Sequence, residues 1–325
     1  MKKLSFFALL ILLPFCCSAQ NLVRNGSFEM DSCRIWLTQN LHGWFNLNSA
    51  DYLHMSCQGV ANSTFKKPHE GRGCIGLYNG GFSVQFNDTV PTHEYVVGEL
   101  LEPLIAGAQY NVSFWVKPSS VFDKPHQNMT TDNISLAFIE DTSELRINRI
   151  PPFDIVINLE PDVSNHTGII SDIHQYTKVE GCYVADGTEK FVVLGNFSPF
   201  GETLTVPLSP NTIYKYSYFL VDKIEVVPFR EIAIPNDTLI CMEDEIVVHF
   251  EAWEDYQFYV NEEEVQDSIP LNSSGFYEIK TVLGACESED SFRLATEECT
   301  NCKFVIPNAF SPDDNGVNDR ISMTS

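Results

Sequence analysis

The stretch that decides the fold is Tyr110-Asn111-Val112-Ser113-Phe114-Trp115-Val116-Lys117. Apolar and polar residues alternate through it, so every second side chain from Tyr110 to Val116 lies on one face, as in a β-strand with one buried side. The same period recurs over residues 134–139, 154–159, 190–194 and 213–227. No segment shows the 3.6-residue period of a long, capped helix. The sequence therefore predicts an all-β protein.

Two β domains are expected. Turn sequences such as Asn79-Gly80-Gly81 separate the apolar runs, and many strands without helices favour a sandwich or a barrel. The strongest break falls near Pro228-Phe229-Arg230, which assigns residues 20–229 to the first domain. Shorter strands follow within residues 230–297, and they favour a small sandwich of immunoglobulin-like type.

The amino terminus has the pattern of an export signal. Lys2 and Lys3 precede an apolar run over residues 6–15, and Cys17-Ser18-Ala19 supplies a small-residue exit. This pattern predicts a secretory signal peptide over residues 1–19. The run is too short to span a bilayer as a mature helix, and no later stretch is long enough. We therefore expect a soluble, exported protein without a membrane span.

The charge of the chain excludes some partners. Its 325 residues include 20 Lys or Arg and 44 Asp or Glu, a formal net charge of −24. Binding to nucleic acid or to an anionic membrane needs basic residues at the phosphates, so neither partner is expected. The acidic surface suits solvation and the binding of divalent cations.

The cysteines predict disulfides. Two of the ten fall in the signal peptide, and an even number of eight remains in an exported chain. Spacing alone does not determine the pairing. The Cys-x-x-Cys at residues 299–302 has no second pair for a metal and no following helix for thioredoxin chemistry, so a disulfide is expected there. The predicted pairs are Cys33–Cys57, Cys74–Cys182, Cys241–Cys286 and Cys299–Cys302.

Asp222 is a carboxylate at a buried position of the predicted strand over residues 214–226. Strand alternation places it on the same face as Leu220 and Ile224. Removing an ionised carboxylate from water costs several kcal/mol unless the charge is compensated. Calcium, with Glu29 of the first strand as a second ligand, is one way to compensate it. Hydrogen bonds from backbone N–H groups, or an arginine, are the alternative.

Five aromatic residues lie in segments rich in Gly, Asn and His, where exposed rings beside polar groups would stack on sugars. The same residue types usually pack in cores, so we expect about two of the five to be exposed. The candidates for ligand binding are Trp36, Trp44, Tyr52, Tyr78 and Tyr95.

Enzymatic motifs are missing from the sequence. There is no Gly-x-Ser-x-Gly, P-loop, His-Glu-x-x-His or dinucleotide fingerprint, and the eight histidines show no ligand spacing. We therefore expect no catalytic residues and a protein that is not an enzyme. A glycoside hydrolase whose carboxylates meet only in space remains an alternative, because 44 acidic residues always offer some pair.

The end of the chain, residues 304–319, reads FVIPNAFSPDDNGVND. It resembles the start of the gliding motility-associated C-terminal domain, the type B sorting module of type IX secretion in Bacteroidetes, although Asp313-Asp314-Asn315 replaces the family's Asn-Gly-Asp. The resemblance implies sorting to the outer cell surface by the type IX machinery, with a link to gliding or adhesion. Such modules are several times longer, so residues 298–325 are expected to be a linker and a truncated sorting domain. The matching residues are Pro307, Asn308, Phe310, Ser311, Pro312, Gly316, Asn318 and Asp319.

The first domain has a resemblance of its own. Residues 21–29, NLVRNGSFE, with Trp44, residues 51–57 and the closing stretch 219–224, resemble the galactose-binding-like jelly rolls related to carbohydrate-binding modules. That family implies a jelly-roll β-sandwich in which Glu29 and Asp222 belong to a structural calcium site. Residues 230–297 resemble the immunoglobulin/PKD-like spacers that precede such sorting modules.

Together these observations predict a secreted cell-surface protein whose calcium-stabilised jelly roll binds an extracellular glycan. The alternatives are a structural adhesin that contacts a surface protein and, less favoured, a glycoside hydrolase.

Overall fold

A computed structural model describes residues 20–29, 41–47, 49–85, 88–120, 123–145, 157–198, 202–250, 253, 255–266 and 268–299, and the side chains of 81–92 and 144 lie outside the description. The predictions for the signal peptide, Cys33, Trp36, Cys302 and the sorting motif fall outside these residues. Strands dominate what is described. The helices there are α1 (Gln58–Ala61), η1 (Pro125–Gln127) and η2 (Thr142–Glu144), each of a single turn. The predicted all-β class is confirmed.

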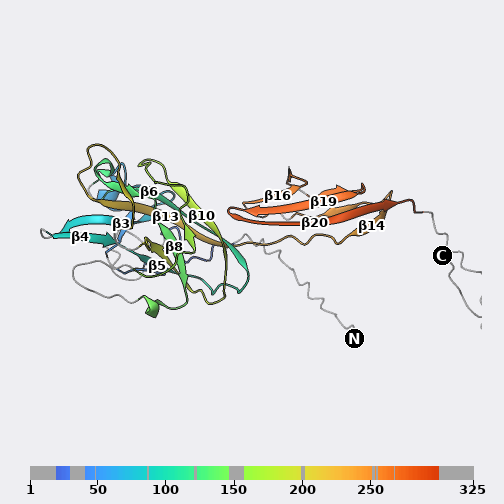
Figure 1. The fold of residues 1–325 in the computed structure, drawn as a ribbon, viewed down its shortest axis with the longest axis horizontal. Helices are drawn as coiled ribbons and strands as arrows, with labels where there is room; N and C mark the ends of the chain where they lie inside the picture. Colours follow the sequence, from blue (N-terminus) through green and yellow to red (C-terminus); the bar gives the residue numbers. More distant parts are fainter. Residues whose placement is uncertain are drawn as a thin grey trace, which may run out of the picture.

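Two sheets form a sandwich in the first domain (Figure 1). The first sheet has the order β1 (Trp44–Asn46), β5 (Val96–Glu99), β11 (Phe191–Gly195), β8 (Ser135–Ile139), β9 (Val163–Ser164). The second sheet has the order β10 (Thr177–Val184), β6 (Gln109–Pro118), β13 (Tyr216–Pro228), β3 (Gly73–Gln85), β2 (Asp51–His54). Added to it are β4 (Asp88–His93), β7 (Met129–Thr131) and β12 (Thr205–Pro207).

The core of the sandwich contains the residues that the alternation pointed to. The stretch Tyr110–Lys117 lies within β6, and its predicted inward residues from Tyr110 to Val116 are all buried in one cluster with Leu136 and Val192 of the first sheet. Their burial removes a large apolar area from water, which is the main favourable term in folding.

The alternation of the closing strand breaks at a bulge. In β13, Phe219 and Val221 point into the core, and Leu220 and Asp222 lie on the opposite side. Lys223 has a positive φ of 49° and the register with β6 shifts after Asp222, so Ile224 returns to the core. The prediction that Asp222 and Ile224 share a face is wrong, because one bulged residue inverts the alternation.

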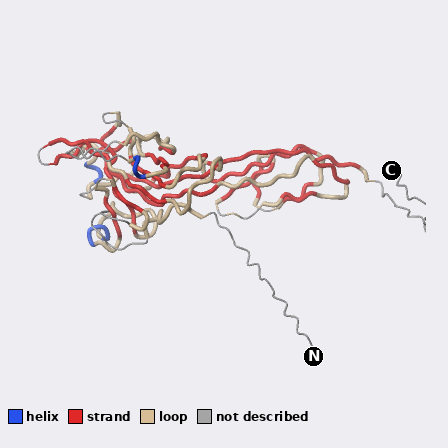
Figure 2. The backbone as a smooth tube through the Cα atoms, turned by 90° about the horizontal axis from the view of Figure 1, so that it is seen from below, coloured by secondary structure: helices blue, strands red, loops and turns tan. Residues whose placement is uncertain are grey.

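The spacer, residues 230–297, is a second β unit that extends away from the sandwich along the longest axis of the molecule (Figures 1 and 2). Its apolar core includes Phe258, Ile279 and Phe292. Its main sheet has the order β14 (Thr238–Cys241), β20 (Cys286–Glu297), β19 (Gly275–Leu283), β16 (Tyr256–Val260), β17 (Glu263–Val265), and β15 (Ile246–Val248) pairs with β18 (Ile269–Leu271).

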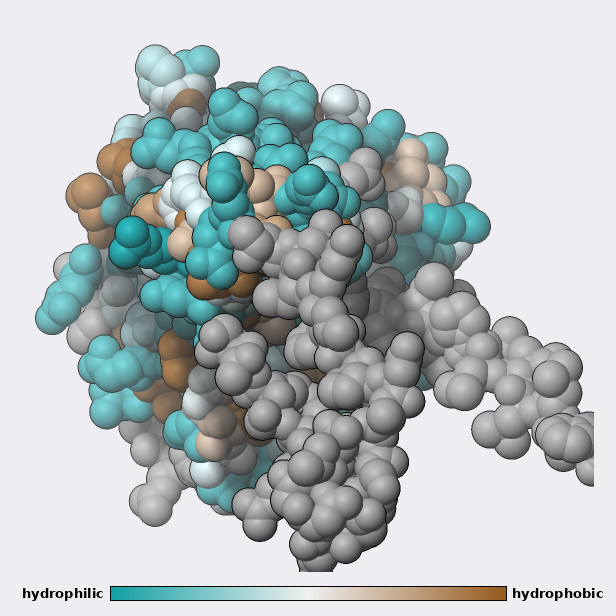
Figure 3. All heavy atoms as spheres, turned by 90° about the vertical axis from the view of Figure 1, so that its right-hand side faces the viewer, coloured by the Kyte–Doolittle hydropathy of each residue, from teal (hydrophilic) through white to brown (hydrophobic). Residues whose placement is uncertain are grey.

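The spacer carries much of the negative charge, with 17 Asp or Glu and three Lys or Arg. Viewed from the spacer end, the described surface is largely hydrophilic, with small hydrophobic groups between (Figure 3). Among the helices that the structure describes, none has the length and apolar content to cross a membrane.

The disulfides differ from the predicted pairs. Within the described part of the chain, disulfides join Cys182 to Cys286 and Cys241 to Cys299, and Cys74 is a buried free thiol. Cys57 is also disulfide-bonded, and its predicted partner Cys33 lies outside the described residues, so that pair stays a prediction.

Strand order explains why three predicted pairs are wrong. Cys74 and Cys182 lie on β3 and β10, three strand spacings apart or about 14 Å, which no disulfide spans. Cys241 pairs with the last residue of β20 and Cys286 is the first, about 35 Å away along a 12-residue strand. Cys299 bonds to Cys241 across this end of the sheet, so it is not available to Cys302.

Candidate functional site

Aromatic rings form a row on the outer side of the second sheet, and we name this row the aromatic face. Ring contacts connect Tyr214 to Tyr216 (5.5 Å between centroids), Tyr216 to Tyr78 (4.9 Å) and Tyr78 to Tyr218 (5.2 Å). The same outer cluster continues through Leu220 and buried Cys74 to Tyr176. Beyond it, His69 contacts Tyr176 (5.2 Å) and stacks on Trp115 (4.1 Å). The aromatic face is therefore Tyr78, Tyr214, Tyr216, Tyr218, Tyr176, His69 and Trp115.

The closing strand supplies two of these rings, and the segment just before it supplies a third. Tyr216 and Tyr218 alternate with inward residues of β13, and Tyr214 precedes the strand with the same period. The ring of Tyr218 lies across Gly76 of β3, where an added Cβ would be 1.9 Å from the hydroxyl. This close approach lets the Tyr218 hydroxyl donate a 2.7 Å hydrogen bond to Asp51 Oδ2 of β2. Burial raises the pKa of the Asp51 carboxyl.

A buried carboxylate holds Tyr78 in place. Glu94 Oε2 accepts a 2.9 Å hydrogen bond from the Tyr78 backbone N–H, and Ser49 Oγ donates to Glu94 Oε1. Burial raises the pKa of Glu94 to about 7, although both hydrogen bonds favour the ionised form. Burial also raises the pKa of Tyr78, so its hydroxyl stays protonated at neutral pH and can donate a hydrogen bond.

The far end of the aromatic face contains a buried lysine. Lys117 of β6 is 4% exposed, and its Nζ lies 4.7 Å from the centre of the Tyr176 ring. Burial lowers the pKa of this ammonium group, and the π face of Tyr176 provides partial compensation for its charge. The Tyr176 hydroxyl donates to the Lys67 carbonyl at 2.9 Å, which ties the loop before β3 to this end.

Two carboxylates position the loop that bears His69. Asp222 Oδ2 accepts the backbone N–H groups of His69 (2.8 Å) and Glu70 (3.1 Å), and Oδ1 accepts that of Lys223 (2.7 Å). Glu29 Oε1 accepts the N–H groups of Arg72 (2.7 Å) and Gly73 (2.8 Å). Residues 69–73 are therefore attached through Asp222 to β13 and through Glu29 to a turn that precedes β1, so Glu29 does not lie on the first strand as predicted.

Asp222 is fully buried, and burial raises its pKa to about 7. Its partners are backbone N–H groups, which is the alternative that the sequence left open. Carboxylate oxygens have the hard character that calcium prefers, but the described residues gather no set of three His, Cys, Asp or Glu for a metal. A calcium ion would need backbone carbonyls or residues outside the description as further ligands. Calcium at Glu29 and Asp222 stays a prediction.

Three of the five predicted sugar-binding rings are core residues. Trp44 and Tyr95 are 0% exposed and Tyr52 is 1% exposed, so none of them can present a ring to a ligand. Their polar atoms are used inside: Trp44 Nε1 donates to Arg24 O (2.8 Å), and the hydroxyls of Tyr52 and Tyr95 donate to Phe28 O (2.9 Å) and Asn196 O (2.6 Å). Buried Trp and Tyr find such partners because an unpaired polar atom there is costly.

Tyr78 is the predicted ring that reaches the aromatic face, where it is half-buried. Tyr214, Tyr216 and Tyr218 were not predicted as site residues. The signal for them was present, since three tyrosines at alternate positions share the side of Leu220 and Asp222. The row also includes Tyr176, Trp115 and His69. They join it because of the order of the strands in the sheet, which cannot be predicted from a local sequence pattern.

The structure also brings two carboxylates together. Asp51 and Glu94 lie within electrostatic reach of each other, and each raises the pKa of neighbouring groups. Glu94 is 3% exposed and both its oxygens accept hydrogen bonds. It therefore supports Tyr78, and it does not reach a substrate as an acid or base would need to.

Comparisons with known proteins give distant likenesses. No protein-family model and no curated protein matches the sequence. Among solved structures, the chain is similar to the K1 cleaved adhesin domain of Lys-gingipain from Porphyromonas gingivalis (12% identity, 62% of this chain and 94% of that chain, TM-score 0.31). It is also similar to the CBM22-1–GH10 modules of Clostridium thermocellum xylanase 10B, complexed with xylohexaose (12%, 69% and 31%, TM-score 0.33). The CBM22-1–CBM22-2 tandem of Paenibacillus barcinonensis Xyn10C gives 12%, 81% and 60%, with a TM-score of 0.34. Likenesses this weak transfer no property to this chain.

Proposed function

We propose that the chain is an extracellular, non-enzymatic binding protein whose aromatic face takes a carbohydrate. The observation that carries the proposal is the row of rings on one side of the second sheet. Tyr78, Tyr214, Tyr176 and Trp115 are half-buried and His69 is exposed, so these five rings are fixed by packing and still accessible. Tyr216 and Tyr218 are 4% and 1% exposed, so they support the neighbouring rings and do not contact a ligand themselves. A sugar ring stacks its C–H groups on such surfaces, and an ordered row suits several consecutive sugars.

Polar groups beside the rings support this proposal. Asp51 is half-buried next to Tyr218, and burial raises the pKa of its carboxyl, although the Tyr218 hydrogen bond and the charge of Lys66 oppose that rise. Binding sites for small ligands combine apolar or aromatic walls with a few placed polar groups, which provide orientation and specificity. A carboxylate, an ammonium group and protonated tyrosine hydroxyls are suitable partners for sugar hydroxyls.

The cell location belongs to the same proposal. Two disulfides among the described residues are typical of proteins in oxidising compartments. Export by the signal peptide, sorting by a type IX machinery and a link to gliding or adhesion rest on residues 1–19 and 304–319, and they stay predictions. A structural calcium ion and an immunoglobulin-like class for the spacer also stay predictions.

The test is a glycan-array screen of the full chain, followed by affinity measurements on any sugar that binds. Tyr214→Ala and His69→Ala remove rings from opposite ends of the aromatic face. We expect each to weaken binding about tenfold, equivalent to about 1.4 kcal/mol for one stacked ring. Phe276→Ala is the matched control, because Phe276 is a 64% exposed aromatic residue of the spacer.

Two outcomes would contradict carbohydrate binding by this face. If no glycan is retained while the chain binds a surface protein, the protein-contacting adhesin is the better description. If a glycan binds and neither ring variant weakens it, the site lies elsewhere on the molecule. Turnover of a chromogenic glycoside, lost on a single Asp or Glu substitution, would make the chain a hydrolase.

A further inference from the structure

The spacer touches the sandwich at two separate places. The first is the connection after β13. The Tyr256 hydroxyl of the spacer accepts the Arg230 backbone N–H (2.8 Å) and donates to the Pro228 carbonyl (3.1 Å), while the Phe229 N–H donates to Gln109 O of β6 (2.9 Å). The rings of Phe229 and Tyr256 stack with centroids 6.1 Å apart. The connection over residues 228–230 is thus hydrogen-bonded to both domains.

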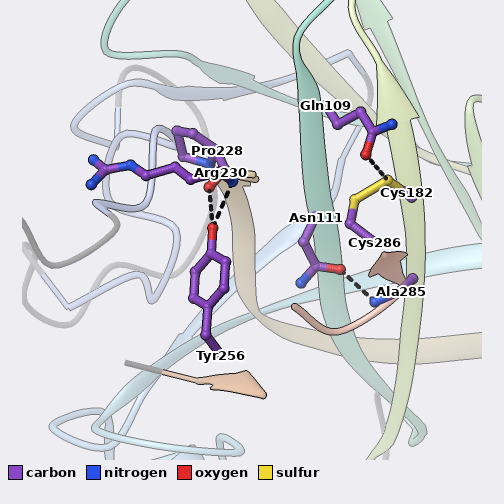
Figure 4. The surroundings of a disulfide bond; sticks show 8 residues. All are labelled: Gln109, Asn111, Cys182, Pro228, Arg230, Tyr256, Ala285 and Cys286. Atoms are coloured by element: carbon purple, nitrogen blue, oxygen red, sulfur yellow. Dashed lines mark hydrogen bonds between the residues drawn. A yellow bond between two sulfur atoms is a disulfide. The ribbon is translucent and has the colours of Figure 1, made fainter. Parts of the chain in front are cut away.

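The second place is the tight turn between β19 and β20. The Ala285 backbone N–H donates a 2.9 Å hydrogen bond to Asn111 Oδ1 of β6 (Figure 4). Gly284, with a φ of 56°, approaches the same side chain so closely that an added Cβ would lie 2.5 Å from its amide atoms. Leu283 and Cys286 are buried here with Phe229, in a cluster that joins the two places.

A disulfide closes this second contact. Cys182 of β10 is bonded to Cys286, the first residue of β20, so a bond between residues 104 apart in sequence connects the domains (Figure 4). The strand β10 is at the edge of the second sheet, away from the start of the connection on β13. The Gln109 side chain lies 3.9 Å from Cys182 Sγ. A disulfide sulfur has no hydrogen to donate, so this is a packing contact.

We propose that the Cys182–Cys286 disulfide is a redox-sensitive latch that sets the orientation of the sandwich on its spacer. With the bond closed, rotation about the connection at residues 228–230 is blocked by the second attachment. With the bond open, the turn keeps one hydrogen bond and a small apolar cluster. Domains of one chain ordinarily move relative to each other unless a large hydrophobic interface joins them. Opening the bond therefore changes a rigid two-domain rod into a hinged chain.

The two cysteines differ in access. Cys182 is an exposed residue, whereas Cys286 is 0% exposed. The thiolate of an external dithiol would attack Cys182 Sγ, forming a mixed disulfide and releasing Cys286 as a thiolate that takes up a proton. The second thiol of the reagent then attacks the mixed disulfide and frees Cys182. Two electrons and two protons reach the cysteines, and the dithiol leaves as its own disulfide.

The experiment is small-angle X-ray scattering of the full chain in oxidised form, after treatment with dithiothreitol, and as the Cys182→Ser/Cys286→Ser double variant. We expect the reduced protein and the variant to share a profile of a flexible two-domain chain, distinct from the rigid profile of the oxidised protein. Cys241→Ser/Cys299→Ser is the matched control, since that bond lies within the spacer and its end. The control variant is expected to keep the rigid profile.

If the oxidised protein, the reduced protein and the double variant scatter identically, the noncovalent contacts alone fix the orientation and the latch is overturned. Treatment of the wild type with dithiol keeps the test valid if the double variant fails to fold. Alkylation and peptide mass spectrometry identify whether Cys182 and Cys286 were reduced in that sample. None of these outcomes depends on whether the aromatic face binds a sugar.

Discussion

At the scale of the residue, Trp44 shows how a buried ring limits its neighbours. Trp44 and Gly98 face each other in the register of β1 and β5, and the ring also contacts Phe28 at 5.0 Å between centroids. A Cβ on residue 98 would lie 2.6 Å from the indole ring. Because the ring is 0% exposed, it has no free space into which to move.

Gly98→Ala is therefore expected to destabilise the protein by about 1–3 kcal/mol, the usual cost of overpacking a core. Gly59→Ala is the control, since an added Cβ there meets nothing within 4 Å and the residue lies in α1. Denaturant midpoints of the two variants and the wild type provide the measurement. Equal midpoints for Gly98→Ala and the wild type would show that the Trp44 ring can shift.

Glu94 makes stability depend on pH. Its pKa is about 7 in the folded protein and near 4.5 in the unfolded chain, so between these values the folded state holds the extra proton. The contribution of Glu94 to the free energy of unfolding is fully present below about pH 4 and is lost as the pH rises through 7. The full effect is at most about 3 kcal/mol.

Glu94→Gln is expected to flatten the decrease in unfolding free energy between pH 4.5 and 7.5, because an amide does not titrate. Part of the decrease in unfolding free energy is expected to remain in this variant, because the pKa of Asp222 is raised in the same direction. The measurement is urea unfolding across this pH range, with exposed Glu160→Gln as control. An unchanged slope in Glu94→Gln would mean that Glu94 does not titrate in this range.

At the scale of the element, the loop over residues 69–73 depends on Glu29 and Asp222. Five backbone N–H groups already satisfy the two carboxylates without a cation. If calcium also binds there, EDTA lowers the melting temperature of the full chain, and added calcium restores it. A ligand at 100 times its Kd stabilises by about 2.7 kcal/mol.

Glu29→Gln distinguishes a loop that binds calcium from a loop whose carboxylates are compensated by N–H groups alone. We expect it to abolish the response to EDTA if calcium binds, because an amide is a weaker cation ligand than a carboxylate. Asp222→Asn is less informative, since its NH₂ group would face N–H donors and destabilise the loop in either case. No response of the wild type to EDTA would remove calcium from the description and leave the N–H groups as the stabilising partners.

At the scale of the whole molecule, the sandwich and the spacer are one mechanical unit in the oxidised protein. The aromatic face and the docking site of the spacer turn both lie on the second sheet, the first on β13, β3 and β6 and the second on β6 and β10. The orientation of the ligand-binding side relative to the spacer is therefore set by the same sheet. An isolated first domain would leave Cys182 unpaired, so experiments require the complete chain.

The sequence by itself determined the all-β class and the inward face of β6. Both are local, because a period of two residues decides which side chains face a core. The sequence also marked Asp222 as a buried charge and named N–H groups as one way to compensate it.

Only the tertiary structure decided the disulfides, the bulge and the membership of the aromatic face. Cys182 meets Cys286 because the spacer turn docks beside β10, and no spacing in the chain reports which domain a turn will contact. Trp44, Tyr52 and Tyr95 look like binding residues in sequence but fill the core, whereas Tyr176, Trp115 and His69 meet through strand order and a loop. Burial and adjacency arise from packing between distant segments, so local patterns indicate which residues can bind and only the fold selects among them.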